Sequence, residues 1–376
     1  MSKLTVERIV VQGFKSIRAA EVELKPINVL IGVNGSGKSN LLSLFSFMNQ
    51  VARRRMQKYV AQAGGADRLL HYGRKITERL HVELYFRTDE QSAMYTCSLI
   101  PTAEDLLIFE EEIFGSVATT VADRLPHEET ALFDWEGRVP FAASLLKAFS
   151  TWHLYHFHDT SDSAKVKQMG DIHDNLVLRP DASNLAAYLY MLKNTAPEYY
   201  RNIVGIVQLA FPFFGDFVLR PSPLNPERIR LEWRERDSDL LFGPHDLSDG
   251  TLRFICLTTL LSQPPERLPA IILLDEPELG LHPHAVVLLA EMVRSAALHT
   301  QVILATQSVT LVNQFDPEDI LVVERVYGET LFGRTTEEEL ASWLKDYTLG
   351  ELWEKNLLAM VAKRSQEGPL EKGSVP

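Results

Sequence analysis

The chain has 376 residues, of which 45% are hydrophobic and 23% are charged, and its formal net charge is −12. This length allows one large α/β domain with an insertion or two domains, and the composition is that of a globular protein. The acidic balance excludes a general attraction to nucleic acid, so any DNA contact would need a local basic patch. Two cysteines cannot build a disulfide framework. The N-terminus lacks a signal-peptide pattern and no run approaches the roughly 18 apolar residues of a membrane span, which predicts a cytoplasmic protein without a membrane partner.

The first third of the chain is rich in strand patterns. Residues 4–12 and 17–24 alternate apolar and polar side chains around a Gly-Phe-Lys-Ser turn, which predicts an antiparallel strand pair. A short apolar run at 27–31 predicts a buried strand, and apolar residues at helical spacing predict a helix from Ser39 to about Ala63. Three further alternating segments predict a β meander, at residues 80–86, 94–100 and 106–113.

Residues 32–39 connect the buried strand to the helix and have the spacing G-x-x-x-x-G-K-S. In this strand–loop–helix context, backbone N–H groups cradle phosphates, and the positive N-terminal end of the helix faces the same anion. Lys38 would reach the β- and γ-phosphate oxygens, and Ser39 would hold a magnesium ion. The predicted contacts to the nucleotide are Asn34, Gly35, Ser36, Gly37, Lys38, Ser39 and Asn40. The loop therefore predicts that the chain binds a nucleoside triphosphate.

From about residue 115 to 215 helical patterns dominate, and beyond that point strands and helices alternate. The predicted helices cover residues 141–152, 183–193, 198–211, 247–262, 283–298, 336–346 and 349–363. The predicted strands cover residues 217–220, 228–234, 270–274, 301–306 and 320–323. This order predicts a first lobe at 1–114, a mainly helical insertion at 115–215, a second lobe at 216–363 and a disordered tail at 364–376.

Two stretches of the second lobe carry residues suited to phosphate chemistry. The apolar run before Asp275-Glu276 fits a buried strand that delivers two carboxylates to its C-terminal edge, where α/β sheets bind ligands. Asp275 would hold magnesium, and Glu276 would polarise the attacking water. Residues 247–251 begin a helix with Ser248, which is either a second anion-binding helix N-terminus or a capped helix with no further role.

These motifs occur in the order typical of ABC-type ATPases, and the chain resembles the RecF/SMC-like ATPases of bacteria. The resemblance extends to Gly-Phe-Lys-Ser-Ile near the start, Leu-Ser-Asp-Gly-Thr-Leu-Arg-Phe as signature and Trp-Leu-x-Asp-Tyr near the end. It implies an α/β fold of the P-loop NTPase class with a mixed central sheet, an antiparallel meander and a helical insertion. It also implies ATP and Mg²⁺ as ligands, and no nuclease domain or coiled-coil arm is expected.

The same resemblance implies a head-to-tail homodimer that sandwiches ATP. The phosphate loop and Asp275-Glu276 of one copy would face Ser248, Asp249 and Gly250 of the other, and residues 279–282 would touch the partner site. The expected catalytic residues are Glu276, Lys38 and Gln307. Two positions depart from the ABC pattern, because Asp249 replaces a glycine and Gln307 replaces the switch histidine. A glutamine cannot carry a proton charge, which predicts slow hydrolysis or dependence on a partner.

Several features leave alternatives open. The first functional hypothesis is an ATP-driven switch in DNA binding or repair, the second is a regulatory ATPase of a phage-defence or toxin-type system with a protein partner, and a transporter motor is the weakest. Arg53-Arg54-Arg55 with Lys58 is either a DNA-binding patch or a solvated helix face. The histidines at 153–159 either ligate a metal or form ordinary core contacts. The apolar stripe at 343–353 predicts core or dimer packing.

Overall fold

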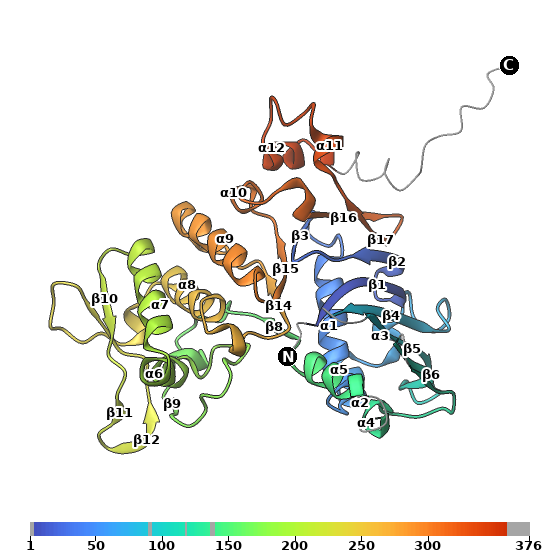
Figure 1. Ribbon diagram of the computed structural model, residues 1–376, viewed down its shortest axis with the longest axis horizontal. Coiled ribbons are helices and arrows are strands. Elements are labelled where there is room, and N and C mark those ends of the chain that lie inside the picture. The colour runs from blue at the N-terminus through green and yellow to red at the C-terminus, as the bar shows by residue number, and fades with distance from the viewer. Residues whose placement is uncertain (1–3, 89–91, 117–118, 136–139, 359–376) are drawn as a thin grey trace. The chain divides into compact units, whose positions relative to one another are not determined.

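The computed structural model describes residues 4–88, 92–116, 119–135 and 140–358 (Figure 1). The predicted tail at 364–376 lies outside the described residues. The chain divides into two compact units, the first formed by Met1–Trp152 with Ala305–Pro376 and the second by His153–Leu304. The boundaries of these units differ from the predicted lobe boundaries at residues 114 and 215. The division into two lobes and an insertion stays a prediction.

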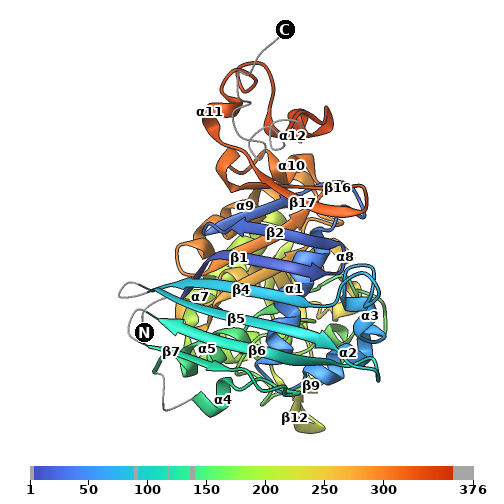
Figure 2. The ribbon, with the colours of Figure 1, turned by 90° about the vertical axis from the view of Figure 1, so that its right-hand side faces the viewer.

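The first unit contains a six-stranded antiparallel sheet with the order β2-β1-β4-β5-β6-β7, whose strands lie side by side in Figure 2. β1 pairs with β2 through a tight turn that sets Phe14 opposite Ile17, which confirms the predicted strand pair. Alternate side chains of β4 are buried, as its sequence pattern predicts. The bounds are β1 Thr5–Phe14, β2 Ile17–Glu23, β4 Leu80–Arg87, β5 Ser92–Pro101, β6 Leu107–Ser116 and β7 Thr120–Asp123.

A second group of strands in this unit carries the glycine-rich loop. β3 (Ile27–Ile31) pairs in parallel with β16 (Ile320–Val326), and β16 pairs antiparallel with β17 (Glu329–Arg334). β17 was not predicted, since its short polar sequence lacks a clear alternation. The helices of the unit are α1 Lys38–Val51, α2 Met56–Ala63, α3 Ala66–Leu69, α4 Leu132–Trp135, α5 Pro140–Ser150, α10 Val309–Val312, α11 Glu337–Leu340 and α12 Leu349–Glu354, with a 3₁₀ turn at Pro317–Asp319.

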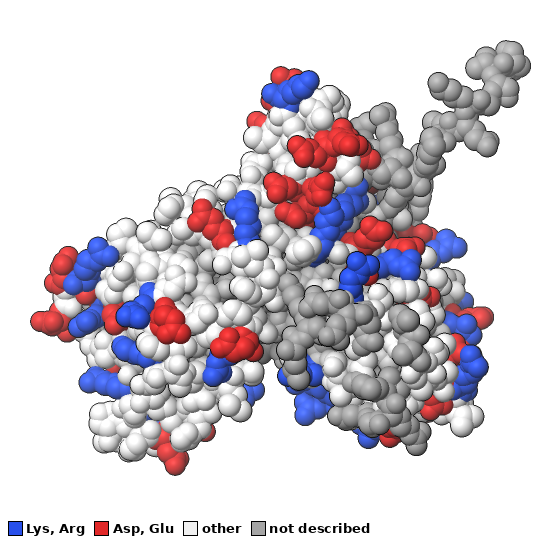
Figure 3. Space-filling view, in the orientation of Figure 1, with Lys and Arg blue, Asp and Glu red and all other residues white. Residues whose placement is uncertain are grey.

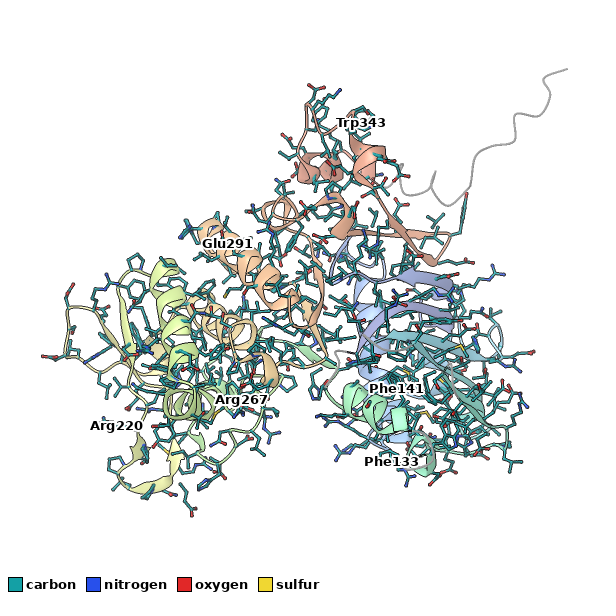
Figure 4. The ribbon with its side chains drawn as sticks, viewed as in Figure 1. Phe133, Phe141, Arg220, Arg267, Glu291 and Trp343 are labelled. Atoms are coloured by element: carbon teal, nitrogen blue, oxygen red, sulfur yellow. The ribbon has the colours of Figure 1, made fainter. Side chains whose placement is uncertain are left out.

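The helix predicted to run from Ser39 to Ala63 is wrong at its middle, because α1 ends at Val51 and α2 begins at Met56. Arg54 is left-handed in the break, with φ 52°, and its guanidinium lies over the Phe133 ring at 4.5 Å (Figure 4). Arg53 donates to the Ser150 carbonyl at 2.8 Å. Both arginines are exposed and lie in the break between α1 and α2, so they are solvated but do not form a helix face, and the choice between a DNA-binding patch and a solvated surface stays a prediction. Gly64 ends α2 in the left-handed conformation expected of a helix C-terminus.

The second unit is built mainly from four helices, α6 Leu185–Thr195, α7 Pro197–Ala210, α8 Asp249–Leu261 and α9 Pro283–Ala297. Its strands are β8 His153–Tyr155, β9 Gly170–Asp171, β10 Phe214–Phe217, β11 Pro221–Ser222, β12 Asn225–Ile229, β13 Trp233–Glu235 and β14 Ile271–Asp275. The 3₁₀ turns are Lys165–Lys167, Pro244–Asp246 and Pro265–Arg267. β15 (Gln301–Thr306) crosses from this unit into the first along the chain. The single strand predicted at 228–234 is wrong, because β12 and β13 belong to different sheets.

The C-terminal helices are shorter than predicted, and their aromatic residues are not core. Leu349 and Leu352 are buried, whereas Trp343 and Tyr347 are 40% and 37% exposed (Figure 4). Residues 359–363 of the predicted last helix lie outside the described residues.

Both cysteines are buried, and burial raises the pKa of each thiol. Within the described ranges, no helix combines the length and apolar character needed to cross a membrane.

A buried carboxylate ties the meander together. Glu112 is fully buried on β6 and accepts hydrogen bonds from the Tyr95 hydroxyl at 2.6 Å and the Ala131 amide at 2.7 Å. His127 lies between two acceptors, the Glu112 carboxylate at 3.1 Å from Nε2 and the Leu125 carbonyl at 2.7 Å from Nδ1. Because an imidazole can donate from both nitrogens only when protonated, these bonds raise the pKa of His127, with the Glu112 bond as the largest cause.

We expect this histidine to make the stability of the first unit depend on pH. Its contribution should be complete below the unfolded-state pKa of about 6.5 and should be lost as the pH rises through the higher folded-state value. Denaturant unfolding of the wild type and of His127→Gln, which keeps an amide donor but does not titrate, measures this. The wild type should lose stability relative to the variant as the pH rises above about 6.5. A difference between the two proteins that stayed constant with pH would contradict the assignment.

Candidate nucleotide-binding site

In the first unit, the glycine-rich loop leaves β3 and enters α1 through two positions that admit no side chain. Gly37 is the N-cap of α1, with φ 112°, and a Cβ atom there would lie 2.1 Å from Thr330 Oγ1 on β17. A Cβ atom on Gly32 would lie 2.2 Å from the Val323 carbonyl oxygen on β16. The loop backbone is therefore pressed against the β16–β17 hairpin, and only glycine fits both contacts.

The polar groups of this loop suit an anion. Asn34, Gly35 and Ser39 are exposed, and α1 is 14 residues long with no acidic side chain in its first turn. Lys38 is 6% exposed, and its ammonium donates to the Gly32 carbonyl at 2.6 Å. Among the described residues, the buried Ser36 hydroxyl has no hydrogen-bond partner. The chemistry of these groups fits a phosphate chain, to which Ser36, Ser39 and Lys38 can all donate.

Gln307 lies next to the phosphate loop although it is far away in sequence. It follows β15, and its side-chain amide donates to Asn34 Oδ1 at 2.7 Å. The first unit thus brings together Asn34, Lys38 and Gln307, three of the residues selected from sequence. An amide in this place can hydrogen-bond a phosphate oxygen or a water molecule but cannot act as a charged acid. Its part in catalysis stays a prediction.

A cavity of about 720 Å³ in the first unit reaches the start of α1 through one residue, and sequence analysis did not find it. Asn40, next to Ser39, lines it and donates to Ser16 Oγ at 2.5 Å. The lining is strongly basic: Lys15, Ser16, Asn40, Asp67, Arg68, Leu70, His71, Tyr72, Gly73, Arg74, Lys75, Arg325 and Gly328. Burial lowers the pKa of Lys15. Sequence analysis named Lys15 and Ser16 only as part of the Gly-Phe-Lys-Ser motif. The cavity could not be predicted because residues 67–75 and the turn at Arg325 and Gly328 complete it, and these segments are distant in sequence.

In the second unit, the carboxylates predicted at a sheet edge are placed as expected. β14 is buried along its apolar residues and pairs in parallel with β8, and Asp275 is its last residue. Glu276 has φ 44°, a left-handed conformation that is uncommon outside glycine. The strand ends at Asp275, directly before this left-handed residue. Backbone strain of this kind collects at functional sites.

The histidine cluster contributes a backbone contact in the same place. His158 Nε2 lies 3.0 Å from the Asp275 carbonyl, and since a carbonyl only accepts, this nitrogen carries the hydrogen. His156 lies next to it, with ring centroids 5.9 Å apart, and burial lowers the pKa of His156. β8 ends at Tyr155, so the strand through His156 and His158 considered in the metal hypothesis is wrong. Within the described ranges, no three His, Cys, Asp or Glu side chains are grouped to hold a metal ion.

The signature segment begins α8 as a capped helix. Ser248 is the N-cap, and its hydroxyl accepts a hydrogen bond from the Thr251 amide at 3.2 Å. Ser248 and Asp249 are exposed, whereas Gly250 packs so closely that a Cβ atom would lie 2.3 Å from the Gly280 carbonyl oxygen. The second unit therefore brings together the signature helix and the loop after Asp275-Glu276. The capping prediction is confirmed, and phosphate binding at this helix stays a prediction.

Comparison with known proteins identifies the fold. The crystal structure titled "SmcHead bound to the C-winged helix domain of ScpA" matches 90% of this chain and 99% of its own, with a TM-score of 0.61 and 15% identity. An Smc head domain with an extended coiled coil from Pyrococcus furiosus matches 91% of this chain and 99% of its own, with a TM-score of 0.57 and 14% identity. The predicted fold class, an α/β P-loop NTPase of the ABC/SMC-head type, is confirmed.

Two sequence matches accompany these structures. A family described as "AAA domain, putative AbiEii toxin, Type IV TA system" matches residues 27–313. A protein of Methanosarcina acetivorans named "Putative ABC transporter ATP-binding protein" is 31% identical over 147 residues, which are 35% of this chain and 52% of that protein. The chain thus spans about half the length of this curated relative.

Two glycines of the phosphate loop give a matched test of its packing. Gly37→Ala should reduce the free energy of unfolding by roughly 2–5 kcal/mol, because the new methyl group would collide with Thr330 and the backbone at this position is left-handed. Gly35→Ala should cost only about 1–2 kcal/mol, because φ is 78° there but no atom lies within 4 Å. Chemical denaturation measures both. Equal losses would show that Thr330 does not constrain the loop.

Proposed function

Since this chain belongs to the AAA-domain family described as a putative AbiEii toxin of a type IV system, and is an ATPase of AAA/ABC type, we propose that it is an ATP-driven dimerisation switch. The observation that carries the proposal is the phosphate loop, where Gly32 and Gly37 admit no side chain and the Lys38 ammonium is held beside the helix N-terminus. The proposal has four parts: phosphate binding, nucleoside binding, sandwich formation and slow hydrolysis.

In the first part, the triphosphate binds along residues 34–40. Lys38 exchanges its bonds to the loop carbonyls for phosphate oxygens, which retains a hydrogen-bonded charge and so costs little desolvation. From motif order, Ser39 and Asp275 would hold Mg²⁺, and the ion would supply positive charge to neutralise the phosphates. Ser36 supplies a further donor from its buried hydroxyl.

In the second part, the basic cavity of the first unit receives the nucleoside end of ATP. It adjoins α1 through Asn40 and has the size of a small-molecule site. Tyr72, which is 61% exposed, offers an aromatic face, and Lys15 offers a partly desolvated ammonium. The cavity rather than the loop would then decide between ATP and other nucleotides.

In the third part, two copies associate head to tail. Ser248 and Gly250 begin a helix whose exposed N-terminus is suited to a γ-phosphate, which the partner copy presents on its own phosphate loop. The loop at residues 279–282 would touch the partner, and Leu279 is 47% exposed in a single copy. In this way one chain uses both phosphate-binding helix ends.

In the fourth part, Glu276 polarises the attacking water and Gln307 orients the γ-phosphate. The Gln307 amide already contacts the loop through Asn34. A glutamine adds a hydrogen bond but no positive charge, so the developing negative charge is stabilised less than by a protonated histidine. We therefore expect a turnover number below about 1 s⁻¹, at the low end of the range of enzymes.

The output of the switch is either a protein partner or DNA. The family description favours a toxin-type system that acts through a partner, and the net charge of −12 agrees with it. The resemblance to RecF/SMC proteins and the SMC-head fold favour a role in DNA binding or repair. On the face shown in Figure 3, basic and acidic side chains are interspersed over the described surface. Of the basic run at 53–58, Arg53 and Arg54 already serve contacts within the unit.

We expect hydrolysis of ATP with Mg²⁺ by the wild type, measured as phosphate release, and a loss of about 100-fold or more in Glu276→Gln. Lys38→Ala should lose nucleotide binding as well as turnover, whereas Glu276→Gln should keep binding. Gln307→His should raise the turnover number roughly tenfold if the missing charge limits the reaction. No turnover or ATP binding by the wild type would contradict the proposal, and a Gln307→His variant no faster than wild type would contradict the cause given for slow hydrolysis.

The same samples distinguish the two outputs. DNA binding that appears only with ATP, and that weakens steeply as salt rises, is the behaviour of phosphate-directed contacts and would identify DNA as the target. An ATP-bound protein that fails to bind duplex or gapped DNA at low salt would favour the protein partner.

A further inference from the structure

One arginine on the signature helix holds three backbone carbonyls from two other segments. Arg253 lies one turn into α8 and is half-buried. Its guanidinium donates from Nη1 to the Leu279 carbonyl at 2.7 Å, from Nε to the Phe157 carbonyl at 3.1 Å and from Nη2 to the His158 carbonyl at 3.0 Å. All of these atoms belong to the second unit.

Each of the two segments held by Arg253 also contacts the backbone of Asp275 or Glu276, at the end of β14. Leu279 follows Glu276 in the same loop, and its amide donates to the Glu276 carbonyl at 3.2 Å. His158 reaches the Asp275 carbonyl through its ring, at 3.0 Å. The Glu276 loop is therefore fixed at both ends, through His158 at Asp275 and directly at Leu279.

A second, independent contact joins this loop to the start of α8. Gly250 packs against the Gly280 carbonyl with no room for a Cβ atom, and Gly280 itself is left-handed, with φ 77°. Beneath Arg253, a small cavity of about 10 Å³ is lined by Phe157, His158 and Asp275. Because the Gly280 carbonyl is packed against Gly250, a shift of the loop changes its contact with the first turn of α8.

We propose that Arg253 is a positioning residue that fixes the loop carrying Glu276 to the first turn of the signature helix. Given the proposed function, a phosphate that docks at Ser248 and Gly250 then changes the position of this copy's own Glu276 loop. The nucleotide of the partner copy would in this way influence hydrolysis at the other site. This role needs an arginine, because its planar donors point in three fixed directions, whereas a lysine ammonium has one donor centre and cannot span the three carbonyls.

The first test uses hydrogen exchange of the nucleotide-free protein and so does not depend on the proposed function. Arg253→Gln and Arg253→Lys should speed exchange of the amides at 157–160 and 278–281 by about tenfold or more, with β15 unchanged. The matched control is Arg267→Gln, which removes a guanidinium bond to the Leu176 carbonyl at 3.2 Å elsewhere in the same unit (Figure 4). The control should leave both loops as protected as in the wild type.

The second test measures turnover. Both Arg253 variants should lower the turnover number about tenfold and change the KM for ATP less than about twofold, since the phosphate loop is in the other unit. Unchanged exchange in both loops would overturn the role of Arg253, whatever the activity. Faster exchange with an unchanged turnover number would overturn the link to Glu276. If the wild type has no ATPase activity, the proposed function and the link between Arg253 and Glu276 would be overturned. The exchange result would still decide whether Arg253 fixes the two loops.

Discussion

The contact between Gly37 and Thr330 constrains the phosphate loop at the point where α1 begins. Thr330 projects from β17 into the turn where α1 begins, and its hydroxyl donates to the Ser36 carbonyl at 2.9 Å. The same residue reaches the β1–β2 turn, because its amide donates to the Ser16 carbonyl at 2.8 Å. One residue thus links the hairpin, the loop and the antiparallel sheet. A loop that must present several N–H groups to one anion needs such support, since a flexible one would lose entropy on each binding event.

The second unit fixes its functional groups in a different way. Here the backbone is held by side chains: His158 contacts the carbonyl of Asp275, Arg253 contacts that of Leu279, and Glu276 occupies a left-handed conformation between them. Both strategies hold reactive groups on rigid elements. In the first unit, glycines allow the loop backbone to pack closely against its neighbours. In the second unit, the side chains of His158 and Arg253 hold backbone carbonyls by hydrogen bonds.

The parts that sequence predicted are those whose signal is contiguous. The glycine spacing at 32–39, the apolar strand before Asp275 and the cap at Ser248 each lie within a dozen residues, and the structure places all of them on the expected elements. Their local chemistry is sufficient, because backbone conformation and capping depend on near neighbours.

The parts that sequence missed depend on contacts between distant segments. Thr330 meets a loop almost 300 positions earlier, and nothing in the polar sequence of β17 indicates it. The break between α1 and α2 contains the left-handed Arg54, and the apolar spacing of the segment does not indicate it. Arg253 is part of the signature segment quoted in the sequence analysis, but its contacts were not predicted. Its three carbonyl partners come together only because β8 and β14 are paired in the fold.

The central claim is that ATP joins two copies through the phosphate loop of one and the signature helix of the other. Mass measurement by light scattering tests it most directly, with Glu276→Gln protein in which bound ATP persists. Addition of ATP and Mg²⁺ should raise the mass from 42.6 kDa to twice that value. The double variant with Ser248→Arg should bind ATP but remain a monomer, because the bulky side chain blocks the exposed start of α8. A mass unchanged by ATP in the Glu276→Gln protein, with binding confirmed, would contradict the account.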